Sequence, residues 1–157
     1  MGLTQRGQTQ KMLFLMAVIK YSTPMGNELI KAPTDAGYDL RNAEESKTLE
    51  SGSFMLLDTK SRVKMPKDFY AMVCSKSGLA AKKGVFVLNA PGIIDPLYVD
   101  DIKVILCNLG KDSVLIEHNE KIAELIFVKK PKVEMVAVSD EIDNKESRGG
   151  FGSTGRF

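Results

Sequence analysis

Residues 102–127, IKVILCNLGKDSVLIEHNEKIAELIF, decide the fold class of this chain. The stretch holds three short apolar runs, and turn-forming or charged residues separate one run from the next. Such punctuation is typical of the strands of a β-sandwich or barrel. The pattern predicts strands at 102–107, 114–116 and 122–127, and beyond this stretch at 12–19, 54–57, 62–65, 69–74, 85–88 and 133–138.

One segment, SGLAAKK at 77–83, breaks this pattern. It contains good helix formers and begins with a serine suited to an N-cap, which predicts a single short helix. A length of 157 residues fits one domain. We therefore expect an all-β domain at 12–140, between a disordered N-terminal segment at 1–11 and a flexible C-terminal arm at 141–157.

Composition and charge exclude several functions. A net charge of +2 is too small for the basic surface of a nucleic-acid-binding protein. The apolar run at 12–19 is too short to span a bilayer, so no membrane partner is expected. Cys74 and Cys107 lie in apolar runs without metal-site spacing, which predicts buried, reduced thiols in a cytoplasmic protein, or one of the host cytoplasm or nucleus if viral. The lone His118 is expected at the surface.

The chain ends in RGGFGSTGRF, residues 148–157. Residues 150–155 match the pattern GxGxxG, but only two residues follow, so the helix that a dinucleotide site requires is absent. Two interpretations remain from the residues alone. The tail is either an arm whose amides, guanidinium and ring bind phosphate and stack on a base, or a disordered terminus.

Two internal segments carry candidate chemistry. Asp95 follows Ile93 and Ile94, and partial desolvation there would raise the basicity of its carboxylate, as suits a general base. An aspartate before Pro96 is equally suited to forming a turn. The segment SKSG at 75–78 offers hydroxyls, an ammonium group and helix amides to a phosphate, although a plain N-cap explains its serine as well.

The order of these segments is more specific than any one of them. AGYDL at 36–40, SKSGLA at 75–80, NAPGIIDPLY at 89–98, KIAEL at 121–125 and RGGFGSTG at 148–155 resemble the five motifs of the homotrimeric dUTP pyrophosphatases. The resemblance implies a jelly-roll-like β-barrel that forms a homotrimer. It also implies Mg²⁺-dependent hydrolysis of dUTP to dUMP and pyrophosphate, which limits uracil incorporation into DNA.

The resemblance implies that each active site lies between subunits. The third motif comes from one subunit, the first, second and fourth from its neighbour, and the arm from the third. Asp95 would deprotonate the water that attacks the α-phosphorus, Asp39, in a turn leading into Leu40, would reach Mg²⁺ through water, and Tyr98 would exclude a 2′-hydroxyl. The other implied contacts are Asn89, Ile93, Ile94 and Lys103 to uracil, Phe151 stacked on it, and Lys76, Ser77, Gly78, Arg148, Gly152, Ser153 and Thr154 to the phosphates.

Several positions depart from the usual family pattern. Lys76 and Lys121 stand where arginine is common, Val99-Asp100 replaces Arg-Gly, and the spacing from Arg148 to Phe151 is shortened. The sharpest departure is Glu124 at a position that is normally glutamine, because a further negative charge there should weaken triphosphate binding.

Two other functions remain as alternatives. The first is a non-catalytic or weakly active regulatory protein on the same fold, for which Glu124 is the only indication. The second is deamination of dCTP, which is disfavoured because the Tyr98 and Phe151 motifs match the dUTP-hydrolysing branch.

Overall fold

The computed structural model describes residues 17–139. The segment 1–11 and the arm 141–157, with Arg148, Phe151, Gly152, Ser153 and Thr154, lie outside the described residues. The described elements are β1 (Lys20–Ser22), β2 (Tyr38–Arg41), β3 (Lys47–Leu49), β4 (Phe54–Asp58), β5 (Arg62–Lys64), β6 (Phe69–Ser75), α1 (Ser77–Lys83), β7 (Val85–Val87), β8 (Gly92–Ile94), β9 (Lys103–Asn108), β10 (Val114–Ile116) and β11 (Lys121–Lys129).

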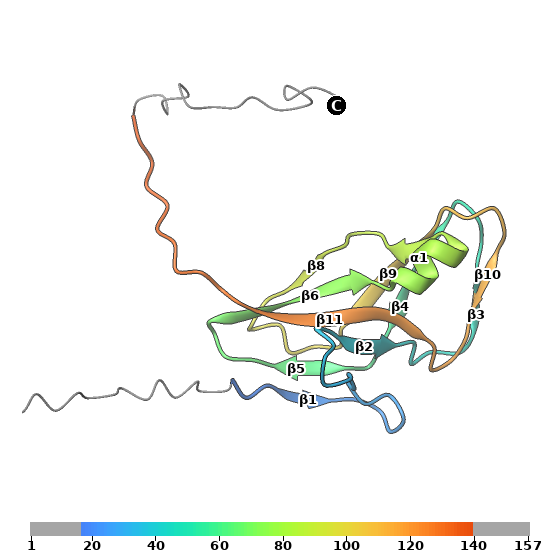
Figure 1. Ribbon diagram of the computed structural model, residues 1–157, viewed down its shortest axis with the longest axis horizontal. Helices are drawn as coiled ribbons and strands as arrows, with labels where there is room; N and C mark the ends of the chain where they lie inside the picture. Colours follow the sequence, from blue (N-terminus) through green and yellow to red (C-terminus); the bar gives the residue numbers. More distant parts are fainter. Residues whose placement is uncertain (1–16, 140–157) are drawn as a thin grey trace, which may run out of the picture.

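Antiparallel ladders join these strands into four sheets (Figure 1). The largest has the order β2-β11-β6-β8, and a second has the order β4-β9-β7. Strands β1 and β5 form one two-stranded ladder, and β3 and β10 form the other. The all-β prediction is confirmed, although the ladders of the described chain remain separate and do not close one continuous barrel.

The core is aliphatic and is built from alternate residues of the strands. In β9, Val104 and Leu106 are completely buried while Lys103 is exposed, which is the period of two that a half-buried strand requires. The other large, fully buried side chains come from almost every sheet; they are Leu40, Leu49, Leu57, Ile102, Ile116, Ile122, Leu125, Val63, Val85 and Val87.

The single predicted helix is confirmed as α1, but its cap differs from the prediction. Lys76 is the N-cap residue and no side chain caps the helix, so Ser77 is its first residue and not its cap. Gly84 ends the helix with a φ of 68°, which favours glycine. A Cβ at Gly84 would also lie 2.7 Å from the backbone nitrogen of Gly110, so this position excludes larger residues on two grounds.

Two predicted strands at the ends of the domain are wrong where the structure describes them. Residues 17–19 of the predicted strand 12–19 are not in a strand, and Val18 is 73% exposed, because the first ladder begins at Lys20 on the outside of the molecule. Residues 131–139 include the predicted strand 133–138, but they are all exposed and run away from the sheets without a partner strand in the described chain (Figure 1). Their apolar composition alone does not make a strand, because a strand needs a neighbour to receive its hydrogen bonds.

Candidate active site

Strand β11 brings three distant segments of sequence together. It pairs with β2 on one side and with β6 on the other, so Glu124 lies opposite both Asp39 and Cys74. Residues directly opposite one another share a face of the sheet, and two like charges there repel. The register therefore places two carboxylates side by side, and this arrangement requires a nearby cation.

Lys76 supplies that cation from the end of β6. Its Nζ lies 2.6 Å from Oδ1 of Asp39 and 2.9 Å from Oε1 of Glu124. Lys121 contacts the other oxygen of Asp39, with Nζ 2.7 Å from Oδ2. We call Asp39, Lys76, Lys121 and Glu124 the four-charge cluster, which carries two positive and two negative charges.

Partial burial and pairing act in opposite directions on the titration of this cluster. Burial alone raises the pKa of Asp39, but the hydrogen bonds from Lys121 and Lys76 outweigh burial and hold the pKa below its ordinary value. Burial also lowers the pKa of Lys76, and the hydrogen bonds to Asp39 and Glu124 reverse this and raise it. Burial and the nearby Glu124 both raise the pKa of Cys74, so this thiol stays protonated at neutral pH.

Two backbone features shape the cluster. A β-bulge interrupts the pairing of β11 with β2 between Lys121 and Ala123, and a bulge redirects the neighbouring side chains. At Gly37 an added Cβ would lie 3.2 Å from Cβ of Glu124, so a residue without a side chain lets the turn before Asp39 approach β11. Ser77 and Gly78 lie exposed at the first turn of α1, immediately after Lys76.

A second group of candidate residues lies around β8. Tyr98 donates its backbone N–H to the carbonyl of Asp95 at 3.0 Å, which forms the turn that follows β8. Asn89 precedes the strand, and a Cβ at Gly92 would lie 3.1 Å from its Nδ2, so the segment from 89 to 92 is tightly folded. Ile93 is exposed and Ile94 is half-buried.

Asp95 lies far from the four-charge cluster within one chain. Ile94 pairs with Ala71 near the start of β6, whereas Lys76 follows the other end of that strand. Asp95 is therefore level with Tyr70, and the six steps along the strand from Tyr70 to Lys76 correspond to about 20 Å of extended chain. One chain brings Asp39, Lys76 and Glu124 together and leaves Asp95, with the turn that it forms with Tyr98, at the opposite end of β6.

Known proteins with similar sequences and structures identify this architecture. The dUTPase family model matches residues 28–155. The deoxyuridine 5′-triphosphate nucleotidohydrolase of Alkaliphilus metalliredigens is 39% identical over 134 residues, which cover 82% of this chain and 92% of that protein. The chain belongs to the dUTPase family.

Solved structures agree on the fold of this dUTPase-family chain. The Staphylococcus bacteriophage 80alpha dUTPase with dUPNHPP matches with a TM-score of 0.77 at 22% identity, over 88% of this chain and 99% of that one. A dUTPase from phage phi11 of S. aureus, described with a structural Mg(II) ion, matches with a TM-score of 0.70 at 19% identity, over 80% of this chain and 99% of that one.

Several sequence-based expectations about single residues are corrected. Asp95 is exposed, not partly desolvated, because Ile93 and Leu97 beside it are also exposed in the chain. Asp39 lies within β2 and not in a turn, because pairing with β11 extends its backbone.

The structure also tests the predicted burial of three other residues and shows one contact that the sequence did not predict. His118 is exposed and Cys107 is buried, as expected, whereas Cys74 is only half-buried. The contact of Lys121 with Asp39 was missed, since only the pairing of β2 with β11 reveals it.

Two absences hold for residues 17–139 of this family member. No three His, Cys, Asp or Glu side chains gather there as a ready set of metal ligands. In the same part of the chain, no helix is long and apolar enough to cross a membrane.

The four-charge cluster makes the titration of Asp39 testable. Replacing Lys121 or Lys76 with methionine removes a hydrogen-bonded cation, so the pKa of Asp39 should rise in both variants, as measured by carbon NMR of its carboxyl group during a pH titration. Lys82 is exposed and forms no ion pair with any side chain of residues 17–139, so Lys82→Met provides the control.

The lowered pKa of Asp39 also determines how the stability of the folded protein changes with pH. The folded-state pKa of Asp39 lies below the unfolded value, so its stabilising contribution is complete above about pH 4 and is lost as pH falls through the folded-state pKa. An unchanged pKa in both lysine variants would contradict the pairing.

Proposed function

We propose that this protein hydrolyses dUTP to dUMP and pyrophosphate. The observation that carries the proposal is the meeting of Asp39, Lys76 and Glu124, from three distant segments, in a chain whose relative at 39% identity is a deoxyuridine 5′-triphosphate nucleotidohydrolase. Phosphoryl-type hydrolysis needs positioning and charge neutralisation more than a covalent nucleophile. A cluster of opposed charges beside an exposed helix start suits that requirement.

The phosphates of the nucleotide would bind at Lys76, Ser77 and Gly78. The ammonium of Lys76 is shared between the carboxylates of Asp39 and Glu124. A triphosphate offers it stronger acceptors, so binding would replace the contact with Glu124 by contacts with phosphate oxygens. Arg148 and the amides of Gly152, Ser153 and Thr154 are proposed to complete the phosphate site, with Phe151 stacked on the base.

Magnesium is the proposed cofactor. The described side chains offer no complete ligand set of their own, and Mg²⁺ is commonly held by one or two carboxylates together with phosphate oxygens and water. Asp39 fits this role through an intervening water, because both of its oxygens already accept hydrogen bonds from lysines. When bound, the ion neutralises phosphate charge in the transition state.

Asp95 is the proposed general base, and Asn89 is the side chain proposed to recognise the edge of uracil. The exposed carboxylate of Asp95 at the end of β8 can reach a water on a nucleotide bound across a neighbouring surface. The compact turn from Asn89 to Gly92 offers an amide side chain and the backbone of Ile93 and Ile94 to the uracil edge. Lys103, the first residue of β9, is proposed as a further contact near the uracil.

The separation of the two groups supports a site shared between subunits. We propose a homotrimer in which the loop of Asp95 and Tyr98 faces the four-charge cluster of a neighbouring chain, and in which the arm 141–157 comes from the third chain. About 20 Å of extended strand separates Asp95 from Lys76 within one chain. Oligomers of this kind build sites from different surfaces of identical subunits.

The first test removes the proposed base. Asp95→Asn keeps the shape of the loop, so dUTP with Mg²⁺ should still bind in calorimetry, while single-turnover hydrolysis should slow by about 10²–10⁴-fold. The exposed Asp112 provides the control Asp112→Asn, which should hydrolyse dUTP at the wild-type rate. Hydrolysis by Asp95→Asn within about tenfold of wild type, a change of about 1.4 kcal/mol, would assign Asp95 to the turn alone.

A second test asks whether two chains build one site. Lys76→Met and Asp95→Asn should each be nearly inactive, because each lacks one half of the site. Unfolding and refolding a 1:1 mixture should restore about a quarter of wild-type turnover, since random assembly joins two intact halves at that frequency. A control mixture of Lys76→Met with Lys76→Met/Asp95→Asn should stay inactive. No recovery in the first mixture would place the site within one chain.

A third test concerns Glu124. Glu124→Gln removes a carboxylate that competes for Lys76, so the KM for dUTP should fall, kcat should rise, or both, and more strongly at low ionic strength. The exposed Glu117 provides the matched control Glu117→Gln. A loss of activity in Glu124→Gln would instead assign Glu124 a positive role in the reaction.

A further inference from the structure

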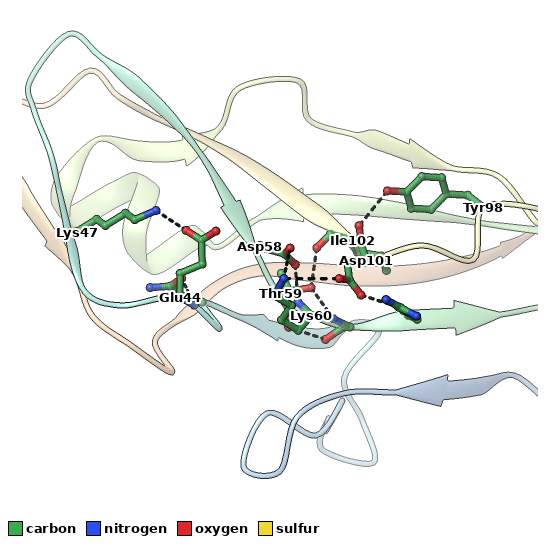
Figure 2. Close-up of polar contacts among 11 residues, drawn as sticks. Glu44, Lys47, Asp58, Thr59, Lys60, Tyr98, Asp101 and Ile102 are labelled. Carbon is green, nitrogen blue, oxygen red and sulfur yellow. Dashed lines mark hydrogen bonds and ion pairs between the residues drawn. The ribbon is translucent and has the colours of Figure 1, made fainter.

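The ring of Tyr98 is held at its far end by a contact within its own chain. The hydroxyl of Tyr98 donates a hydrogen bond of 2.9 Å to the backbone carbonyl of Asp101 (Figure 2). Tyr98 as a whole residue remains 39% exposed. The hydroxyl therefore anchors the side chain to the loop, while a face of the ring stays free for a ligand.

The carboxylate of Asp101 is in turn held by cations from another part of the chain. Nε of Arg62 in β5 lies 2.6 Å from Oδ1 of Asp101, and Nζ of Lys60 lies 3.8 Å from Oδ2. Lys60 also contacts Asp58, with Nζ 2.9 Å from Oδ2. We call Lys60, Arg62, Tyr98 and Asp101 the tyrosine latch; Figure 2 labels Lys60, Tyr98 and Asp101.

The base of the latch is a buried polar turn. The hydroxyl of Thr59, which has no solvent exposure, donates to the carbonyl of Ile102 at 2.7 Å, and the backbone N–H of Ile102 donates to the carbonyl of Ser61 at 2.8 Å. Buried hydrogen bonds of this kind are costly to break. The residue next to Asp101 is thus fixed, whereas the preceding residues Val99 and Asp100 are exposed.

We infer that Arg62 and Asp101 are positioning residues that set the discrimination between deoxyribose and ribose by fixing the ring of Tyr98. The inference rests on the proposed function and on the role that the family resemblance implies for Tyr98, the exclusion of a 2′-hydroxyl. A ring rejects a 2′-hydroxyl only when it cannot move away, because rejection by clash requires a rigid wall. In this chain the latch supplies the rigidity through Arg62 of β5.

The latch explains a departure from the family pattern. Tyr98 is followed by Val99-Asp100 in place of the usual Arg-Gly, so the residue after the tyrosine carries no cation here. The guanidinium beside this loop comes instead from Arg62 of β5. Because the side chain of Arg62 is 57% exposed, it can be replaced without opening the core.

Kinetics test the inference directly. Arg62→Gln and Asp101→Asn should each lower the ratio of kcat/KM for dUTP to that for UTP by about fivefold, the scale of a partly exposed ion pair. The change should come mainly from better use of UTP, with kcat for dUTP within about twofold of wild type. Tyr98→Phe, which keeps the ring and removes the anchor, should lower the ratio at least as much, and Arg62→Gln added to it should have no further effect.

Matched controls separate the latch from a general effect of charge. Lys64 lies on the same face of β5 as Arg62 and forms no ion pair within the part of the chain that the structure describes, so Lys64→Gln should leave the ratio unchanged. Arg62→Lys keeps the charge and should restore part of the selectivity. A ratio in Arg62→Gln within about twofold of wild type, or an equal fall in Lys64→Gln, would overturn the inference.

A measurement without substrate tests the tyrosine latch independently of the proposed reaction. Fluorine NMR of protein labelled with 3-fluorotyrosine, with the Tyr98 signal assigned by its loss in Tyr98→Phe, should show that signal shifted or broadened by Arg62→Gln and not by Lys64→Gln. An unmoved signal would overturn the latch. A wild-type protein that fails to hydrolyse dUTP would contradict the proposed function, and the fluorine signal would then decide the latch by itself.

Discussion

The pairing of β11 with both β2 and β6 is the constraint on which the candidate site depends. This register sets Glu124 opposite Asp39, and a sheet cannot hold two neighbouring carboxylates without compensation. Lys76 and Lys121 provide it, so the electrostatics of the cluster follow from strand order. The bulge in β11 and the missing side chain at Gly37 are local adjustments to the same pairing.

The charge balance of the cluster also shows what a glutamate, in place of a glutamine, does at position 124. With glutamine at this position, Lys76 would have one carboxylate partner and would be freer to accept phosphate. With glutamate, Lys76, the proposed phosphate-binding cation, lies in a linear series of alternating charges, Glu124–Lys76–Asp39–Lys121. Such a network holds the lysine side chain in place but lowers its affinity for a ligand, because an existing ion pair must break before the ligand binds.

The sequence predicted the parts of the fold that rest on local patterns. The strand predicted at 114–116 coincides with β10, and the helix predicted at 77–83 coincides with α1. Both predictions use signals that depend only on residues adjacent in the sequence, namely the alternation of apolar residues and the run of helix-forming residues. Strands β1, β2, β3 and β8 were missed, since each is only three or four residues long and is defined by its partner strand. For the same reason, the exposure of Asp95 and the contact of Lys121 with Asp39 could not be predicted: both depend on how distant segments pack.

The exposed stretch at 131–139 has a consequence for the newly made chain. Val133, Met135, Val136 and Val138 are all more than 60% exposed, in a run without proline from residue 132 onward. Segments of this composition are prone to intermolecular β-aggregation until something covers them. Lys129, Lys130, Pro131 and Lys132 immediately before the run match the charged and proline gatekeepers that flank such segments. These residues therefore oppose the self-association of newly made chains through the exposed apolar run that follows them.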